Sequence, residues 1–251
     1  MNDPTEMEYG WDVLKQCLRD YEISNCVAET NRLSNFMENI EKPALYGVFY
    51  LHFYHEEKTP FVISFSQRKD FLPMWSMYGG NGSGVCLCFD DKAINIKNEK
   101  AAIFPILNAL YVNQIENGKR TLAVLQECID KQYQIYLKND KTLNDGEKII
   151  TLGALIPFVS AYIKDSAFDY EQEERLVALA NDIHKSVQFR ISNRNNIIPY
   201  VEVPIPTNSM KEIIIGPNIK PECVESGLQL ALHTCGLNVP ISLSKIPYRE
   251  S

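Results

Sequence analysis

Apolar residues near the start of the chain recur at helical spacing. Asp3 can cap a helix, Pro4 suits its first position, and Glu6 completes a capping box. The stripe that follows has spacings of four, three, four and three residues. It consists of Met7, Trp11, Leu14, Leu18 and Tyr21. The pattern predicts an amphipathic helix that begins near residue 4.

Shorter apolar segments further along the chain have the pattern of β-strands. Residues 61–66 alternate between apolar and polar side chains, and residues 85–89 form a second strand. Between them, Asp70 opens a short helix that ends in a glycine-rich turn. Further strands are predicted at 174–180, 199–206, 212–215 and 241–243, while 44–53 fits either a strand or a buried helix.

Three further helices are predicted, at 122–137, at 149–163 and from Pro221 to Gly236. The apolar run 149–163 is shorter than the roughly twenty residues that a membrane span requires, so we expect a buried core helix and no membrane partner. No internal repeat or low-complexity linker interrupts the chain. We expect one α+β domain over residues 1–251, with a mixed, mostly antiparallel central sheet flanked by helices.

The composition narrows the class of protein. The chain has 251 residues, of which 45% are hydrophobic and 23% charged, which excludes a disordered, collagen-like or coiled-coil protein. The net charge of −7 excludes an overall basic surface for nucleic acid, although a local patch stays open. Seven cysteines without a C-x-x-C pair favour free thiols in a reducing compartment. The first residues lack the features of a signal peptide, so we expect a cytoplasmic protein.

The segment Tyr170–Arg175 concentrates charge at the start of a predicted strand. In an extended chain Glu171, Glu173 and Arg175 share one face, and a carboxylate held there can stabilise a developing positive charge. A solvated acidic turn is the simpler alternative, and it is favoured by spacing alone. Arg175, Arg190 and Arg249 could bind a pyrophosphate, or each could pair with a nearby carboxylate.

Hydroxyl and aromatic side chains supply the other candidate contacts. Ser64 and Ser66 lie on one strand face and could bond a ligand or their own backbone. Trp75 and Tyr78 are about one helical turn apart and could stack on a flat ligand or fill the core. A metal site is not expected, because His52 and His55 have no third ligand in a recognised spacing.

Several motifs together resemble a bacterial family known as domain of unknown function 2971. The family has an N-D-P-x-E helix start, a strand ending in F-S, and the pattern A-F-x-x-E-x-E-x-R. Its members usually carry a strand and a helix ahead of N-D-P-x-E, so the resemblance implies that this chain is truncated at its N-terminus. The matching residues are Asn2–Glu6, Phe65-Ser66, Asp70, Met74-Trp75, Tyr78, Gly84, Phe89-Asp90, Ala167-Phe168, Glu171, Glu173, Arg175, Arg190, Pro199-Tyr200, Ile213–Pro217 and Ser244–Arg249.

The order of these motifs is similar to that of the ADP-ribosyltransferase fold, which has a Ser or Tyr on a middle strand and a catalytic Glu entering a later one. The resemblance implies NAD as a substrate and no metal. Cleaving the nicotinamide–ribose bond develops an oxocarbenium-like cation that a glutamate stabilises. The implied catalytic residues are Glu173, Glu171 and Ser66, and the implied ligand-binding residues are Ser64, Asp70, Trp75, Tyr78, Arg175 and Arg190.

Three functions stay open at this point. The first is an NAD-consuming transferase or glycohydrolase, an effector in phage defence or toxicity whose nucleic-acid or protein acceptor is unknown. It predicts that Ser64, Ser66 and Glu173 line one cleft with the aromatic pair. The second is a non-catalytic regulatory module that binds a nucleotide-like small molecule in the same pocket. The third is a structural network of Asp70, Trp75, Glu173 and Arg175 that holds a corner of the sheet.

Overall fold

The computed structural model describes residues 4–38, 49–51, 56–58, 60–94, 96, 98, 101–112, 159–180, 183–192 and 195–247. The chain divides into two compact units, each built from two separate stretches of sequence. The first unit comprises residues 1–65 and 99–202, and the second comprises 66–98 and 203–251. The prediction of a single domain stays a prediction.

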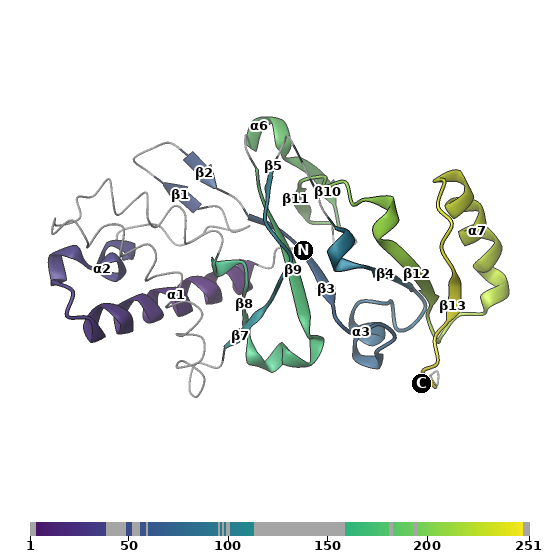
Figure 1. Cartoon of the computed structure of the whole chain (residues 1–251), viewed down its shortest axis with the longest axis horizontal. Helices are drawn as coiled ribbons and strands as arrows, with labels where there is room; N and C mark the ends of the chain where they lie inside the picture. Colours follow the sequence, from purple (N-terminus) through teal and green to yellow (C-terminus); the bar gives the residue numbers. More distant parts are fainter. Residues whose placement is uncertain are drawn as a thin grey trace. The chain divides into compact units, whose positions relative to one another are not determined.

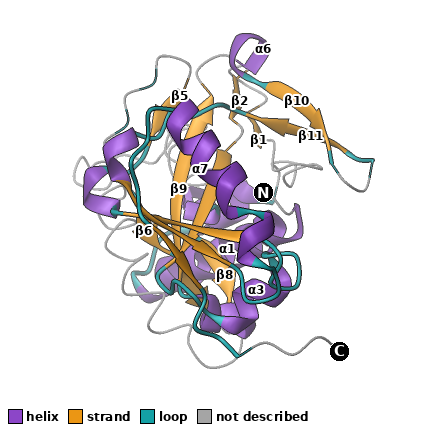
Figure 2. Ribbon diagram, turned by 90° about the vertical axis from the view of Figure 1, so that its right-hand side faces the viewer, coloured by secondary structure: helices purple, strands orange, loops and turns teal. Residues whose placement is uncertain are grey.

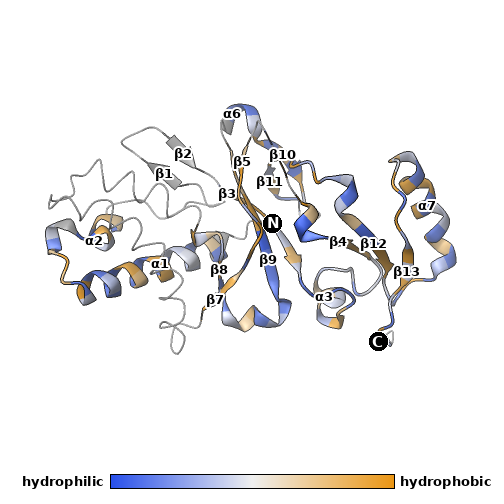
Figure 3. Cartoon of the chain, in the orientation of Figure 1, coloured by the Kyte–Doolittle hydropathy of each residue, from blue (hydrophilic) through white to orange (hydrophobic). Residues whose placement is uncertain are grey.

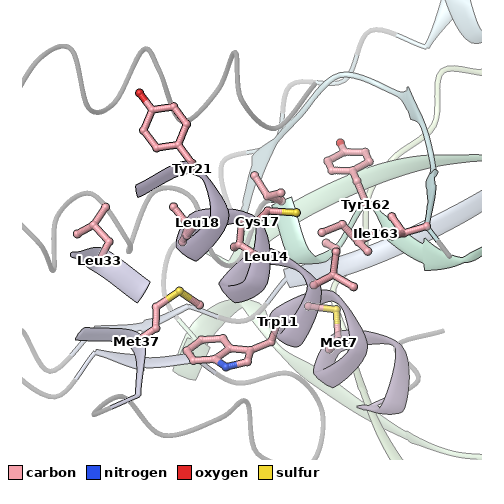
Figure 4. Close-up of a cluster of buried hydrophobic side chains, with 14 of the residues drawn as sticks. Met7, Trp11, Leu14, Cys17, Leu18, Tyr21, Leu33, Met37, Tyr162 and Ile163 are labelled. Carbon is pink, nitrogen blue, oxygen red and sulfur yellow. The ribbon is translucent and has the colours of Figure 1, made fainter. Parts of the chain in front are cut away.

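The first unit has a helical core built around α1 (Pro4–Ser24), which is confirmed as the predicted N-terminal helix. All five residues of its apolar stripe are buried, and its apolar and polar positions alternate along the ribbon (Figure 3). The stripe packs with Leu33 and Met37 of α2 (Leu33–Met37) and with Tyr162 and Ile163 (Figure 4). A short 3₁₀ helix, η1 (Glu29–Asn31), connects the two helices (Figure 1).

A four-stranded sheet of the first unit is organised around β9 (Glu173–Ala180), which lies between β3 (Pro60–Ser66) and β5 (Ala101–Ile103). The short β6 (Leu107–Asn108) also pairs with β9 (Figure 2), and both β5 and β6 run antiparallel to it. Leu107 pairs with Arg175 and Asn108 with Glu174, so β6 borders the first residues of β9.

The remaining strands of the first unit form two-stranded pairs. β7 (Leu110–Val112) is parallel to β8 (Ile163–Asp165). β1 (Phe49–Leu51) is antiparallel to β2 (Glu56–Lys58), and β10 (Gln188–Ile191) is antiparallel to β11 (Ile197–Tyr200). The 3₁₀ helix η3 (Ser166–Glu171) follows β8, and α6 (Ile183–Ser186) precedes β10.

The second unit is built on a three-stranded sheet in the order β13-β12-β4. Here β4 (Val85–Phe89) is antiparallel to β12 (Met210–Ile215), which is parallel to β13 (Ile241–Leu243). The helices of this unit are α3 (Leu72–Met77) and α7 (Glu225–Thr234). Short 3₁₀ helices are η2 (Asp91–Ala93), η4 (Thr207–Ser209) and η5 (Pro221–Cys223).

The predicted α+β class with mostly antiparallel strands is confirmed. The strand predicted at 199–206 is wrong in extent: β11 ends at Tyr200, and the stretch after it contains Pro204 and Pro206, which cannot donate ladder hydrogen bonds. The prediction of a helix at 149–163 is wrong at its C-terminal end, where the structure describes the chain, because Ile163 begins β8. The helix predicted at 122–137 lies outside the described residues. In the part of the chain that the structure describes, no helix has the length and apolarity to cross a bilayer.

Candidate functional site

Arg175, on β9, has its guanidinium surrounded by acceptors in the first unit. Its Nε donates to Oε1 of Glu173 at 2.9 Å, and its Nη2 donates to Oε2 of the same residue at 3.1 Å. Nη1 donates to the carbonyl of Ala161 at 2.7 Å, and Nη2 also reaches Oε2 of Glu6 at 2.8 Å. Arg175 is 2% exposed. Its guanidinium is therefore committed to partners within this unit.

Lys164, on β8, is the second cation that pairs with these carboxylates. Its Nζ donates to Oε2 of Glu171 at 2.6 Å and to Oε2 of Glu173 at 2.8 Å. Glu6 of α1 lies 3.5 Å from the same nitrogen. Four of these five residues are at most 5% exposed, while the Glu6 side chain is 31% exposed. We call Glu6, Lys164, Glu171, Glu173 and Arg175 the ion cluster.

The backbone places Glu171 and Glu173 in different elements. The common face that an extended chain would give does not include Glu171, because Glu171 ends the 3₁₀ helix η3 and Glu173 begins β9. Between them Gln172 has φ 45° and turns the chain. Both carboxylates nevertheless converge on Lys164, since its ammonium has three donors and can bridge them.

Two hydroxyl groups border Glu173. The exposed hydroxyl of Ser64, on β3, is close enough to the Glu173 carboxylate to help lower its pKa. The hydroxyl of Tyr111, on β7, accepts the backbone N–H of Glu173 at 2.7 Å. The Phe168 ring, which is 37% exposed, has its centroid 5.1 Å from Nζ of Lys164. An exposed hydroxyl and an exposed aromatic ring therefore stand beside buried charge.

Charge pairing outweighs burial at each shifted group of the cluster. Burial by itself raises the pKa of Glu173, but hydrogen bonds and the charge of Arg175, together with Lys164 and Ser64, hold that pKa below its usual value. Burial lowers the pKa of Lys164, yet its bonds to Glu171 and Glu173 raise it overall. The pKa of Arg175 is raised in the same way. Three carboxylates against two cations leave the cluster with one formal negative charge in excess.

The predicted residues Asp70 and Trp75 lie in the second unit, in a hydrogen-bond network of their own. The indole Nε1 of Trp75 donates to Oδ1 of Asp70 at 2.9 Å, and Trp75 is 3% exposed. Asp70 also accepts from Oγ of Ser244 and, at 2.8 Å, from the backbone N–H of Lys245. Burial raises the pKa of Asp70, but these hydrogen bonds hold it below its ordinary value. Asp70 and Trp75 therefore connect α3 to the segment after β13.

The other predicted residues lie apart from this network. Tyr78 follows α3 and is 57% exposed. Oγ of Ser66 accepts the backbone N–H of Arg68 at 3.2 Å, a local turn contact. Arg190 is exposed on β10, where its backbone pairs with Ile198. His52, His55 and Arg249 lie outside the described residues. The structure thus brings together Ser64, Glu171, Glu173 and Arg175, with Ser66, Asp70, Trp75 and Tyr78 assigned to the second unit.

Sequence reasoning missed three residues around Glu173. Glu6 was predicted only as a capping-box residue, and Lys164 and Tyr111 were not singled out. A signal for Lys164 was present, because a lysine beside Ala161, Tyr162 and Ile163 is expensive to bury unless it is paired. The described residues contain no group of three or more His, Cys, Asp or Glu side chains placed to hold a metal ion.

The sequence model of a family described as Protein of unknown function (DUF2971) matches residues 74–176. This match supports the predicted resemblance to DUF2971. The matched region includes Trp75, Tyr78, Glu171, Glu173 and, near its end, Arg175. The motifs before residue 74 and after residue 176 stay predictions. No curated protein and no solved structure matches the chain significantly.

Proposed function

We propose that the chain cleaves the nicotinamide–ribose bond of NAD at the ion cluster. The observation that carries this proposal is that Ser64 and Glu173, from the two motifs expected to act together, lie on the neighbouring strands β3 and β9 and that Ser64 contributes to the lowered pKa of Glu173. Glu173 stays ionised at neutral pH because its pKa is lowered, so its negative charge is present when a cation develops. Cleavage moves positive charge from the nicotinamide ring to the ribose, and the excess negative charge of the cluster would favour that charge on the ribose in the transition state.

Each side chain then has a distinct part. Ser64 is exposed and its hydroxyl lies near the ionised Glu173 carboxylate, so its oxygen can accept a hydrogen bond from a ribose hydroxyl. Glu173 is 5% exposed and acts through Ser64 and through its charge. Phe168 supplies an exposed ring against which a flat base could stack. In the hydrolytic reaction water attacks the ribose carbon, nicotinamide leaves with the bonding pair, and the proton of water goes to solvent.

The direct test measures nicotinamide and ADP-ribose after incubating the purified chain with NAD. We expect release by the wild-type chain and a loss of about 100-fold or more in Ser64→Ala, a magnitude typical of removing one stabilising hydrogen bond. Ser76→Ala is the matched control, since Ser76 is exposed on α3 and bonds its own helix. Ser66→Ala tests whether the second hydroxyl of the strand contributes.

A second candidate function is a non-catalytic module that binds a nucleotide-like molecule. It is favoured by the burial of Glu171 and Glu173, whose carboxylates are already paired with Lys164 and Arg175. This function predicts that NAD raises the melting temperature without nicotinamide release. If NAD causes neither nicotinamide release nor a shift in melting temperature, both candidates are removed and the ion cluster keeps a structural role.

If the chain cleaves NAD, it could act in cells in two ways: as an effector that depletes NAD, or as a transferase that modifies a macromolecule. Hydrolysis by an expressed chain would lower cellular NAD, which would connect the activity to toxicity or phage defence. Transfer would instead attach ADP-ribose to nucleic acid or protein. Cells expressing the wild type or Ser64→Ala, compared for NAD content and for ADP-ribose on each class of macromolecule, separate these outcomes.

A further inference from the structure

Two cysteine side chains lie on one face of β4 in the second unit. Alternate residues of a strand point to the same side, and the Sγ atoms of Cys86 and Cys88 are 4.0 Å apart. Both are free thiols and both are half-buried, so small solutes can reach them. We call Cys86 and Cys88 the thiol pair. It is a C-x-C arrangement, which differs from the C-x-x-C spacing and the histidine pair considered from the sequence.

The distance between the two sulfur atoms suits a bound metal ion better than a disulfide. With a metal–thiolate bond of about 2.3 Å, two sulfur atoms on one ion stand at most about 4.6 Å apart. The observed 4.0 Å lies within that limit. A disulfide requires Cα atoms within roughly 6.8 Å, which alternate residues of a strand, at about 6.4–6.8 Å, reach only at the edge of the range.

The carboxylate of the residue paired with Cys88 across the sheet is already hydrogen-bonded by other side chains. Glu212 of β12 pairs in register with Cys88, but its carboxylate accepts from Nζ of Lys69 and from Oγ of Ser242, each at 2.7 Å.

We propose that the thiol pair is a two-coordinate site for Cu(I). Thiolates are soft ligands that select Cu(I), and two donors suit the absence of any larger donor group among the described residues. On binding, two S–H bonds release their protons to solvent and two S–Cu bonds form, so copper stays monovalent and no electron is transferred. The ammonium of Lys69, next to Cys88, offsets part of the negative charge of the dithiolate.

The test titrates the reduced, full-length chain with Cu(I) in competition with a chromogenic Cu(I) chelator. We expect uptake of one ion per chain with release of two protons, and X-ray absorption should show two sulfur neighbours. Cys86→Ser and Cys88→Ser should each bind more than about 100-fold more weakly, since even indirect partners of a metal cost 10–100-fold. Cys223→Ser is the matched control, because Cys223 is an exposed free thiol of the same unit.

Melting temperatures of all variants establish that each one is folded, and Cys88→Ala provides a second replacement at the same position. Binding that survives in Cys86→Ser and Cys88→Ser, or that disappears equally in Cys223→Ser, would overturn the proposal. So would ready formation of a Cys86–Cys88 disulfide with peroxide in a chain that takes up no Cu(I), because the pair would then belong to redox chemistry.

Discussion

Glu173→Gln tests how much the ion cluster contributes to the free energy of unfolding. The carboxylate accepts from Arg175 at 2.9 and 3.1 Å and from Lys164 at 2.8 Å, in a side chain that is 5% exposed. The amide keeps the shape of the side chain, but it loses the charge and turns an N–H₂ group toward one of the cations. Breaking a buried ion pair by changing one partner costs about 3–5 kcal/mol. At roughly 2–4 °C per kcal/mol, the melting temperature should fall by about 6–20 °C.

The effect of Glu173→Gln should depend on pH with a defined sign. The pKa of Glu173 is lowered in the folded protein, so its ionised form stabilises the fold above the unfolded-state value of about 4.3. That stability is lost as pH falls through the lower folded pKa. The difference between wild type and variant should therefore be largest near neutral pH and shrink in acid below about pH 4.

The measurement is urea unfolding followed by circular dichroism across that pH range. Glu174→Gln is the matched control, since it makes the same chemical change at the next position of β9, on the other face of the strand. A difference of less than about 1 kcal/mol between the two variants at neutral pH would refute the reasoning, because a surface ion pair contributes no more than that.

Three further substitutions test packing and hydrogen bonding, one in the first unit and two in the second. Leu14→Ala, at a fully buried site of α1, should cost about 2–5 kcal/mol in urea unfolding. Trp75→Phe removes the hydrogen bond to ionised Asp70 and should cost about 1.5–3 kcal/mol by the same measurement. Gly216→Ala places a Cβ 2.2 Å from the carbonyl oxygen of Gly82, so we expect a loss of about 1–3 kcal/mol and a lower melting temperature by calorimetry.

Controls for Leu14→Ala and Gly216→Ala come from positions with the opposite environment. Ile23→Ala, at 55% exposure on the same helix as Leu14, should change stability by less than about 0.5 kcal/mol. Gly227→Ala introduces a Cβ with no atom within 4 Å, so it should be tolerated where Gly216→Ala is not. Equal effects at a test site and its control would contradict the burial or the close approach from which each expectation was derived.

Local patterns were sufficient to predict much of the secondary structure. The stripe from Met7 to Tyr21 predicts α1 because five apolar residues fall on one helical face. The segments at 85–89 and 241–243 match β4 and β13 because their side chains are strongly strand-forming and flanking turns limit them. The spacing of apolar residues does not predict β6 and β7, because strands of two and three residues are too short to show a period.

The candidate site was only partly predictable because its partners are distant in sequence. Pairing of Arg175 with a nearby carboxylate was one of two alternatives that the sequence left open, and Arg175 does bond Glu173, two residues away. Its contact with Glu6 spans 169 positions, and no local pattern encodes such a pairing. Lys164 was hidden because it follows an apolar run that suggested a core helix, and only the tertiary fold shows which carboxylates compensate its burial.

The pairing of β4 with β12 has a consequence for synthesis on the ribosome. Phe89 ends β4, and the described strand that pairs with it begins at Met210, about 120 residues later. At about 5–20 residues per second, the ribosome needs about 6–24 s to make the intervening chain. During that interval β4 has no partner strand, so its unpaired backbone N–H and C=O groups can pair with other segments. Slower elongation would lengthen this exposure, so the yield of folded protein should depend on translation speed between these two strands.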